Sequence, residues 1–167
     1  MKNRLVVFRY IAFALEMILL AVLQSTPKLM PEIFGSKPLL LVAAALCFAG
    51  VEEVVPSTVL GAVCGVIADL SGTGRIGFFA VALTLCCYGI SHLMNTRLRS
   101  NLFTLMLLSL GGVILIIGLY FVFFRLLAGV PDSGILFVNH YISRILYTYV
   151  CIVPLYFLNS FLKRRLT

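Results

Sequence analysis

Long apolar runs separated by short polar segments dominate the chain. A helix that crosses a membrane needs about 20 apolar residues. Four runs reach that length, at about Leu5–Leu23, Ile76–Met94, Leu102–Phe124 and Ile145–Leu162. Pro154 lies inside the last run, where neighbouring helices can satisfy the carbonyl group that a proline frees. After the first run, Thr26–Pro38 holds three prolines and a glycine, and this composition predicts a loop.

The segment Leu39–Leu70 is too long for one ordinary span and short for two. Acidic and helix-breaking residues interrupt it near its middle, namely Glu52, Glu53 and Pro56. We therefore predict two short helices, about Leu39–Val51 and about Ser57–Leu70, with Ser57 as the N-cap of the second. The sequence then predicts an all-α integral membrane protein with six transmembrane helices.

The segment Ile135–Arg144 has a different pattern from its neighbours. On a helix its apolar residues share one face, and its polar residues gather on another, namely Asn139, His140, Ser143 and Arg144. Such an amphipathic stretch either lies at the outer interface of the membrane or extends the last helix as a polar lip above the bilayer.

Composition supports a membrane environment for the whole chain. Of its 167 residues, 62% are hydrophobic and 11% are charged, whereas soluble domains carry roughly 25% charged residues. A chain this short leaves much of its surface exposed, so the solvent for that surface has to be lipid. No polar stretch is long enough to form a separate domain, and we expect one transmembrane domain over residues 1–167.

Basic residues predict the orientation. The net charge is +7, and the Lys and Arg residues lie beside apolar runs, which is typical of topology signals and anionic-lipid contacts rather than of nucleic-acid binding. With six spans, eight basic residues fall inside, namely Lys2, Arg4, Arg9, Arg97, Arg99, Lys163, Arg164 and Arg165. Five fall outside, namely Lys28, Lys37, Arg75, Arg125 and Arg144. Five spans would reverse the bias, so we expect six spans in a bacterial cytoplasmic membrane, with both termini cytoplasmic.

Candidate chemistry is sparse. The five cysteines lie inside apolar runs without metal-ligand or redox spacing, and we expect buried thiols at Cys47, Cys64, Cys86, Cys87 and Cys151. His92 and Asn95 lie near the inner end of one span, and two isolated histidines do not make a metal site. No nucleophile–base pair or phosphate loop is evident. We predict no catalytic residue, no metal ligand and no cofactor, and hence no enzyme.

Small residues and one carboxylate form the densest motif. Gly61, Gly65 and Asp69 are spaced by four and share one helix face, and Gly77 follows a short turn. Small residues let two membrane helices approach closely. The glycines therefore indicate helix packing, with a functional groove or a partner contact as the alternative. Asp69 serves either as a helix-end group or as a charge that engages a partner or a loop cation such as Arg75.

Glu16 lies near the middle of the first span. A carboxylate at that depth is costly unless it is protonated or paired, which makes it a functional-site candidate by default. Structural pairing inside the bundle is the alternative, and Arg9 lies two turns away on a similar face.

The stretch Gly61–Gly77 resembles the rod shape-determining protein MreD family. That family typically has a glycine-rich third helix that ends in Asp-Leu, followed by a short turn and a Leu-Gly or Ile-Gly step into the fourth helix. Here these elements read GAVCGVIADL, SGTGR and Ile76-Gly77. The remaining chain is similar in layout alone. The Glu52-Glu53 pair and the segment Ile135–Arg144 depart from the family pattern.

The resemblance implies a non-enzymatic scaffold of the bacterial cell-wall elongation machinery that maintains rod shape. Its expected partners are an MreC-like single-span protein, a RodA-like glycosyltransferase, a class B transpeptidase, the MreB filament and membrane lipids. No nucleic-acid partner is expected, and self-association stays open. MreD proteins also look similar in fold to the substrate-binding subunits of energy-coupling-factor vitamin transporters. A vitamin-binding subunit is therefore the alternative function.

Overall fold

The computed structural model describes residues 2–26, 38–73, 77–96, 102–123 and 142–165. In these ranges the chain forms six α-helices and no strand: α1 (Lys2–Ser25), α2 (Leu40–Val51), α3 (Val54–Ala68), α4 (Phe78–Thr96), α5 (Leu102–Phe121) and α7 (Ile142–Arg165). A π-helical turn, η1 (Asp69–Thr73), continues α3. Five helices are long and apolar enough to cross a membrane, and α2 is a shorter apolar helix. The predicted all-α membrane bundle is confirmed.

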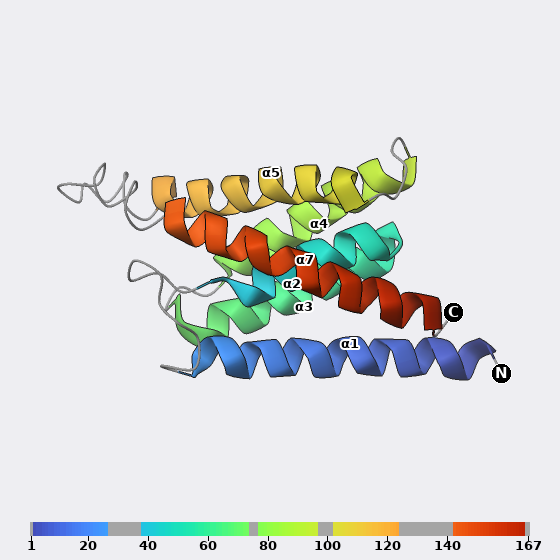
Figure 1. Ribbon diagram of the computed structural model, residues 1–167. Coiled ribbons are helices and arrows are strands. Elements are labelled where there is room, and N and C mark those ends of the chain that lie inside the picture. The colour runs from blue at the N-terminus through green and yellow to red at the C-terminus, as the bar shows by residue number, and fades with distance from the viewer. Residues whose placement is uncertain (1, 27–37, 74–76, 97–101, 124–141, 166–167) are drawn as a thin grey trace.

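The helices lie roughly parallel or antiparallel to one another, with α1 and α5 on opposite sides of the bundle (Figure 1). The N-terminal end of α1 and the C-terminal end of α7 lie at the same end. Helix α2 runs towards that end, and α3 returns from it after the short turn at Glu52 and Glu53. The α2–α3 pair therefore behaves as the two antiparallel helices that the sequence predicts.

Helix α2 forms the centre of the bundle. All twelve of its residues are buried, and it packs against each of the other five α-helices. Its sequence, LLVAAALCFAGV, is apolar on every side, as expected of a fully buried helix. The three consecutive alanines Ala43–Ala45 let neighbouring backbones come close. At 1.5 Å per residue α2 is about 18 Å long, well short of the roughly 30 Å hydrocarbon core of a bilayer.

Helices α3 and α4 pack at two glycines on one face of α3. A Cβ atom on Gly61 would lie 2.6 Å from the Cys87 sulfur, and one on Gly65 would lie 2.5 Å from Ala80 Cα. At Gly65 the obstacle is α4 backbone, which cannot rotate away as a side chain can. The spacing of four thus marks an internal helix contact, and the two glycines face α4 rather than lipid.

The start of α3 differs from the prediction. Helix α3 begins at Val54, so Ser57 lies inside its first turn and donates its hydroxyl hydrogen to the Val54 carbonyl at 3.0 Å. The predicted N-cap at Ser57 is therefore wrong. Pro56 is the third helical residue, where a missing N–H costs no intrahelical bond. An early helix start at Val54 is thus compatible with the proline.

The predicted polar lip falls largely outside the described ranges. Asn139 and His140 lie there, whereas Ser143 and Arg144 belong to the first turn of α7, which starts at Ile142. Ser143 and Arg144 therefore extend the last helix, which is one of the two predicted alternatives.

We predict that Gly65→Ala lowers the stability of the folded protein, although alanine is the better helix former. The added methyl group would meet α4 backbone, and overpacking of this kind costs on the order of 1–3 kcal/mol. The matched control is Gly89→Ala in α4, where a Cβ meets no atom of the described residues within 4 Å. Thermal unfolding in detergent should show Gly65→Ala below wild type and Gly89→Ala at or above it. Equal melting temperatures for the two variants would contradict the contact.

Candidate functional site

Polar side chains from the surrounding helices satisfy the N-terminal end of α2. The Leu39 N–H donates to Thr148 Oγ1 of α7 at 3.1 Å, and the Leu41 N–H donates to Gln24 Oε1 of α1 at 3.2 Å. Thr148 in turn donates its hydroxyl hydrogen to the Arg144 carbonyl at 2.7 Å. The first N–H groups of any helix lack intrahelical partners, and within a membrane they need protein acceptors. Here two different helices provide them.

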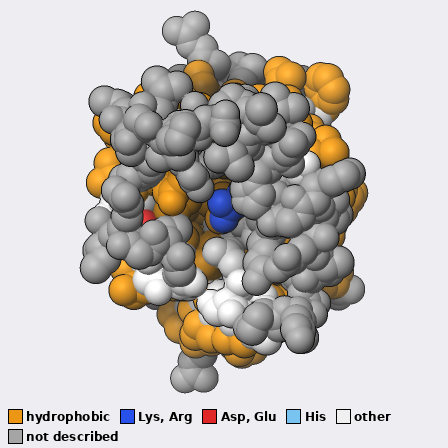
Figure 2. Space-filling view, turned by 90° about the vertical axis from the view of Figure 1, so that its left-hand side faces the viewer, with side chains coloured by type: hydrophobic (Ala, Val, Ile, Leu, Met, Phe, Trp, Pro, Cys, Tyr) orange, Lys and Arg blue, Asp and Glu red, His pale blue; other side chains and the backbone are white. Residues whose placement is uncertain are grey.

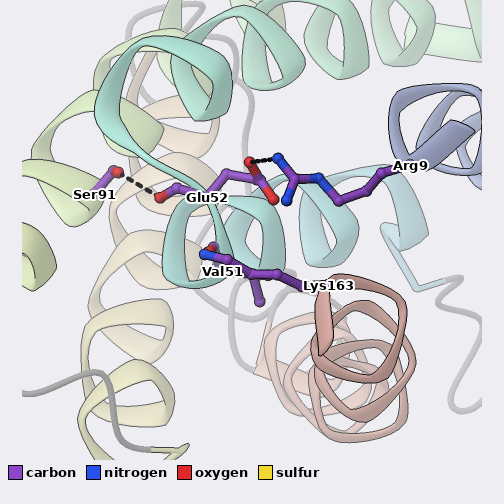
Figure 3. A network of polar contacts seen from close by, with 5 residues as sticks. All are labelled: Arg9, Val51, Glu52, Ser91 and Lys163. Atoms are coloured by element: carbon purple, nitrogen blue, oxygen red, sulfur yellow. Dashed lines mark hydrogen bonds and ion pairs between the residues drawn. The ribbon is translucent and has the colours of Figure 1, made fainter. Parts of the chain in front are cut away.

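The C-terminal end of α2 receives donors in the same way (Figure 3). Lys163 Nζ donates to the Val51 carbonyl, and Ser91 Oγ donates to the Glu52 carbonyl at 3.2 Å. A cation at this position also interacts favourably with the negative end of the α2 dipole. Glu53, at the N-cap of α3, is exposed and close to the positive end of that helix. Glu53 therefore lies where the α3 dipole favours its charge, whereas Glu52 is the C-cap of α2, at the negative end of the α2 dipole, and depends on nearby cations for compensation.

A buried ion pair joins this turn to α1. Arg9 Nη2 donates to Glu52 Oε2 at 3.1 Å, with side-chain exposures of 10% and 3%. The Arg9 guanidinium also lies 5.3 Å from the centre of the Tyr10 ring. A charge buried at this depth requires a partner of opposite sign, and each of these residues provides it for the other. We define Arg9, Glu52, Ser91 and Lys163 as the turn cluster.

Asp69 connects the end of α3 to the start of α4. Its carboxylate accepts hydrogen bonds from the backbone N–H groups of Gly77, Phe79 and Ala80, at 2.9, 3.1 and 3.0 Å. Its side chain is buried, with 3% of the residue exposed. A carboxylate here satisfies the first N–H groups of α4 and suits the positive end of its dipole. These bonds give Asp69 a helix-end role, although the end belongs to the following helix. Arg75 lies outside the described residues.

Gly77 has a different role from the other two glycines of the motif. Among the described residues a Cβ there would meet nothing within 4 Å, so no packing contact of the predicted kind is seen at this residue. Its φ of +102° lies in a region that residues with a Cβ rarely adopt. The glycine thereby turns its N–H towards Asp69 at the entry to α4. Gly61, Gly65, Asp69 and Gly77 together form one structural unit between α3 and α4.

Glu16 pairs with the last helix and not with Arg9. It is 7% exposed, and its Oε1 accepts a hydrogen bond from Asn159 Nδ2 of α7 at 3.1 Å. Arg9 binds Glu52 instead, two helical turns nearer the N-terminus of α1. Asn159 was not predicted, although an uncharged amide in an otherwise apolar span was a signal for it.

The remaining candidates have structural roles. Asn95 Nδ2 donates to Ser91 Oγ at 3.2 Å, and His92 is exposed and stacked on Tyr88 with ring centres 5.9 Å apart. Cys47, Cys64 and Cys87 are buried as predicted, while Cys86 and Cys151 are half-buried. The Cys87 thiol donates to the Ala45 carbonyl at 3.3 Å, a further contact with α2. Within the described ranges, no three metal-binding side chains come together.

These features define the class of the molecule as a multi-pass α-helical membrane protein whose internal polar groups hold a short central helix. Viewed from the end where α1 and α3 finish, the described side chains are mostly apolar, with a basic and an acidic group visible among them (Figure 2). No protein-family model matches the chain, and no curated protein and no solved structure is significantly similar to it.

We predict that Asp69→Asn destabilises the protein. The amide would turn an NH₂ group towards backbone N–H donors that now share two carboxylate oxygens, and a buried unsatisfied polar group costs about 1–3 kcal/mol. Unfolding in detergent measures the loss. Glu53→Gln is the control, because Glu53 is exposed and forms no side-chain cap bond. Wild-type stability of Asp69→Asn would show that the carboxylate is not needed to cap α4.

We predict that Arg9 and Glu52 are strongly coupled. Either Arg9→Met or Glu52→Met alone leaves a buried charge without its counterpart, which costs about 3–5 kcal/mol. The double variant removes both charges and should be more stable than either single variant. A double-mutant cycle on the free energy of unfolding in detergent tests this. Additive losses would mean that the two side chains do not stabilise each other.

Proposed function

We propose that this chain is a membrane scaffold of the bacterial cell-wall elongation machinery, acting by holding other membrane proteins together. The supporting observation is that four residues of the Gly61–Gly77 stretch, which carries the MreD resemblance, form one folded unit. Gly61 and Gly65 permit the α3–α4 contact, and Asp69 and Gly77 build the entry into α4. These residues therefore stabilise the α3–α4 hairpin and the surfaces beside it.

The filled centre of the bundle also supports a scaffold over a vitamin-binding subunit. A small-molecule site needs a concave pocket with convergent polar groups. Here α2 occupies the middle of the helix bundle, and most of its residues are completely buried. The polar groups that reach α2 are bound to its backbone ends. The central helix therefore contributes rigidity, which suits a protein that positions others.

The proposal includes the orientation of the chain in a bacterial cytoplasmic membrane. The start of the first helix and the end of the last helix lie at the same side of the bundle, which agrees with an even number of crossings. Arg9 and Lys163 belong to the turn cluster near that side. Basic residues favour the cytoplasmic face, so we place both termini there.

The function is tested by depletion and by affinity capture from membranes. Depleting the protein in its native bacterium should turn rods into spheres and delocalise the wall synthases. Capture of the tagged chain should recover an MreC-like single-span protein and a RodA-like glycosyltransferase. Gly89→Ala, expected to fold as wild type, serves as the control for tagged variants.

A screen for vitamin binding provides the opposing outcome. Stoichiometric binding of a vitamin by the purified chain, with an energy-coupling ATPase module recovered in place of wall synthases, would overturn the scaffold. Unchanged rod shape after depletion would overturn it as well.

A further inference from the structure

Glu16 of α1 and Asn159 of α7 form a polar pair in the interior of the bundle. Glu16 is 7% exposed, and Asn159 is completely buried. Asn159 Nδ2 donates a hydrogen bond to Glu16 Oε1 at 3.1 Å. Glu16 lies near the middle of the apolar stretch Val6–Ser25, so the pair lies far from both membrane surfaces. We call Glu16 and Asn159 the acid–amide pair.

Two oxygens of the acid–amide pair lack a hydrogen-bond donor. Glu16 Oε2 and Asn159 Oδ1 are both buried, and neither has a partner among the described residues. An ionised carboxylate and an amide carbonyl can only accept hydrogen bonds. The hydrocarbon core of a membrane contains no water that could supply a donor. If Glu16 were ionised, two acceptors would therefore stay unsatisfied in an apolar environment, which is costly.

An ionised Glu16 would also lack a counter-ion. Arg9, on the same helix, is paired with Glu52 at 3.1 Å, and Lys163 of α7 donates to the C-terminal end of α2. Within the described parts of α2 and α3, the titratable groups that interact electrostatically with Glu16 are two thiols, Cys47 and Cys64. A thiol carries no positive charge in either of its protonation states. A negative charge at this depth would thus be isolated, and isolated charges within a membrane are costly.

A proton on Glu16 removes both costs. A protonated carboxyl group is uncharged and has one O–H donor. Its O–H can donate to Asn159 Oδ1, beside the bond that Asn159 Nδ2 already donates to Glu16 Oε1. The two planar groups then share two hydrogen bonds, and each of the four polar atoms has a partner. One N–H···O bond accompanied by two unpartnered oxygens is the arrangement of heavy atoms that such a pair leaves when its proton is not drawn.

The acid–amide pair lies where α1 has few other attachments. An apolar groove of about 390 Å³, the α1–α7 groove, lies between residues Phe8–Leu19 of α1 and the side chains of Leu158 and Leu162 of α7. Nearer its two ends, α1 is attached by Arg9, which binds the turn between α2 and α3, and by Gln24, which binds the start of α2. The acid–amide pair therefore provides a polar attachment of α1 between these two.

We propose that Glu16 is a neutral carboxylic acid that forms two hydrogen bonds with Asn159 and thereby fastens α1 to α7 within the membrane. The proton is part of the contact, because without it the same site would contain an isolated charge and two unsatisfied acceptors. The inference concerns the closure of the bundle and does not depend on the proposed scaffold function.

Infrared spectroscopy of the full-length chain in lipid tests the protonation state. At neutral pH the wild-type protein should show the C=O stretching band of a protonated carboxylic acid. Glu16→Gln should lose this band. The control Glu53→Gln should keep it, because Glu53 is exposed. A wild-type spectrum without the band, or a band that persists in Glu16→Gln, would overturn the proposal.

The frequency of the same band tests the pairing. Asn159→Leu removes both hydrogen bonds from the acid and should move the band to higher frequency. Ser160→Ala, one position further along α7 and only half-buried, should leave it in place. An unchanged frequency in Asn159→Leu would show that Glu16 keeps its proton without binding Asn159, and the pair would then be wrong.

Thermal unfolding in detergent provides a second test, which holds even where Asn159→Leu does not fold. Glutamine at position 16 can form two hydrogen bonds with Asn159 without a proton, so Glu16→Gln should melt close to wild type. Glu16→Leu leaves the buried Asn159 amide without a partner and should melt below Glu16→Gln. If Glu16→Gln melts as low as Glu16→Leu, the site needs a charged carboxylate and the proposal fails.

Discussion

The structure depends on the burial of a helix that is too short to cross the membrane. Helix α2 is about 18 Å long, so its terminal N–H and C=O groups lie where water is scarce, and each needs a partner from the protein. Gln24 and Thr148 satisfy one end, while Ser91 and Lys163 satisfy the other. Four polar side chains in three spans are thereby explained by a single constraint, and α1, α4 and α7 are fixed around one axis.

The same constraint accounts for the charges of the turn cluster. The chain must reverse direction between α2 and α3 inside the bundle, and Glu52 and Glu53 occupy the reversal. Glu53 reaches the surface, whereas Glu52 is buried and pairs with Arg9. Replacing such a buried pair by apolar residues often costs little stability. The pair is therefore better understood as fixing the register of α1 against the turn than as a large source of stability.

The type of the described helices and most of their boundaries could be predicted from the sequence, because lipid requires long apolar runs and because prolines and acidic residues mark their interruptions. The spacing of Gly61 and Gly65 also indicated a packing face. The partners could not be predicted. Arg9 and Glu16 share a face of α1, yet Arg9 binds Glu52 and Glu16 binds Asn159. Pairing across 43 and 143 positions depends on how the helices are arranged around α2, and periodicity along one helix does not contain that information.

The buried carboxylates bind groups of the same chain, and this limits how the protein can recognise other proteins within the membrane. Three buried carboxylates are described: Glu52 pairs with a cation, Asp69 caps α4, and Glu16 has one oxygen engaged with Asn159. The apolar outer faces of α1, α5 and α7 resemble lipid chains and discriminate weakly between neighbours. Specificity then has to come from shape and from the few polar atoms that a neighbour can reach. The α1–α7 groove offers shape alone, because Glu16 in its lining turns its carboxyl group into the protein.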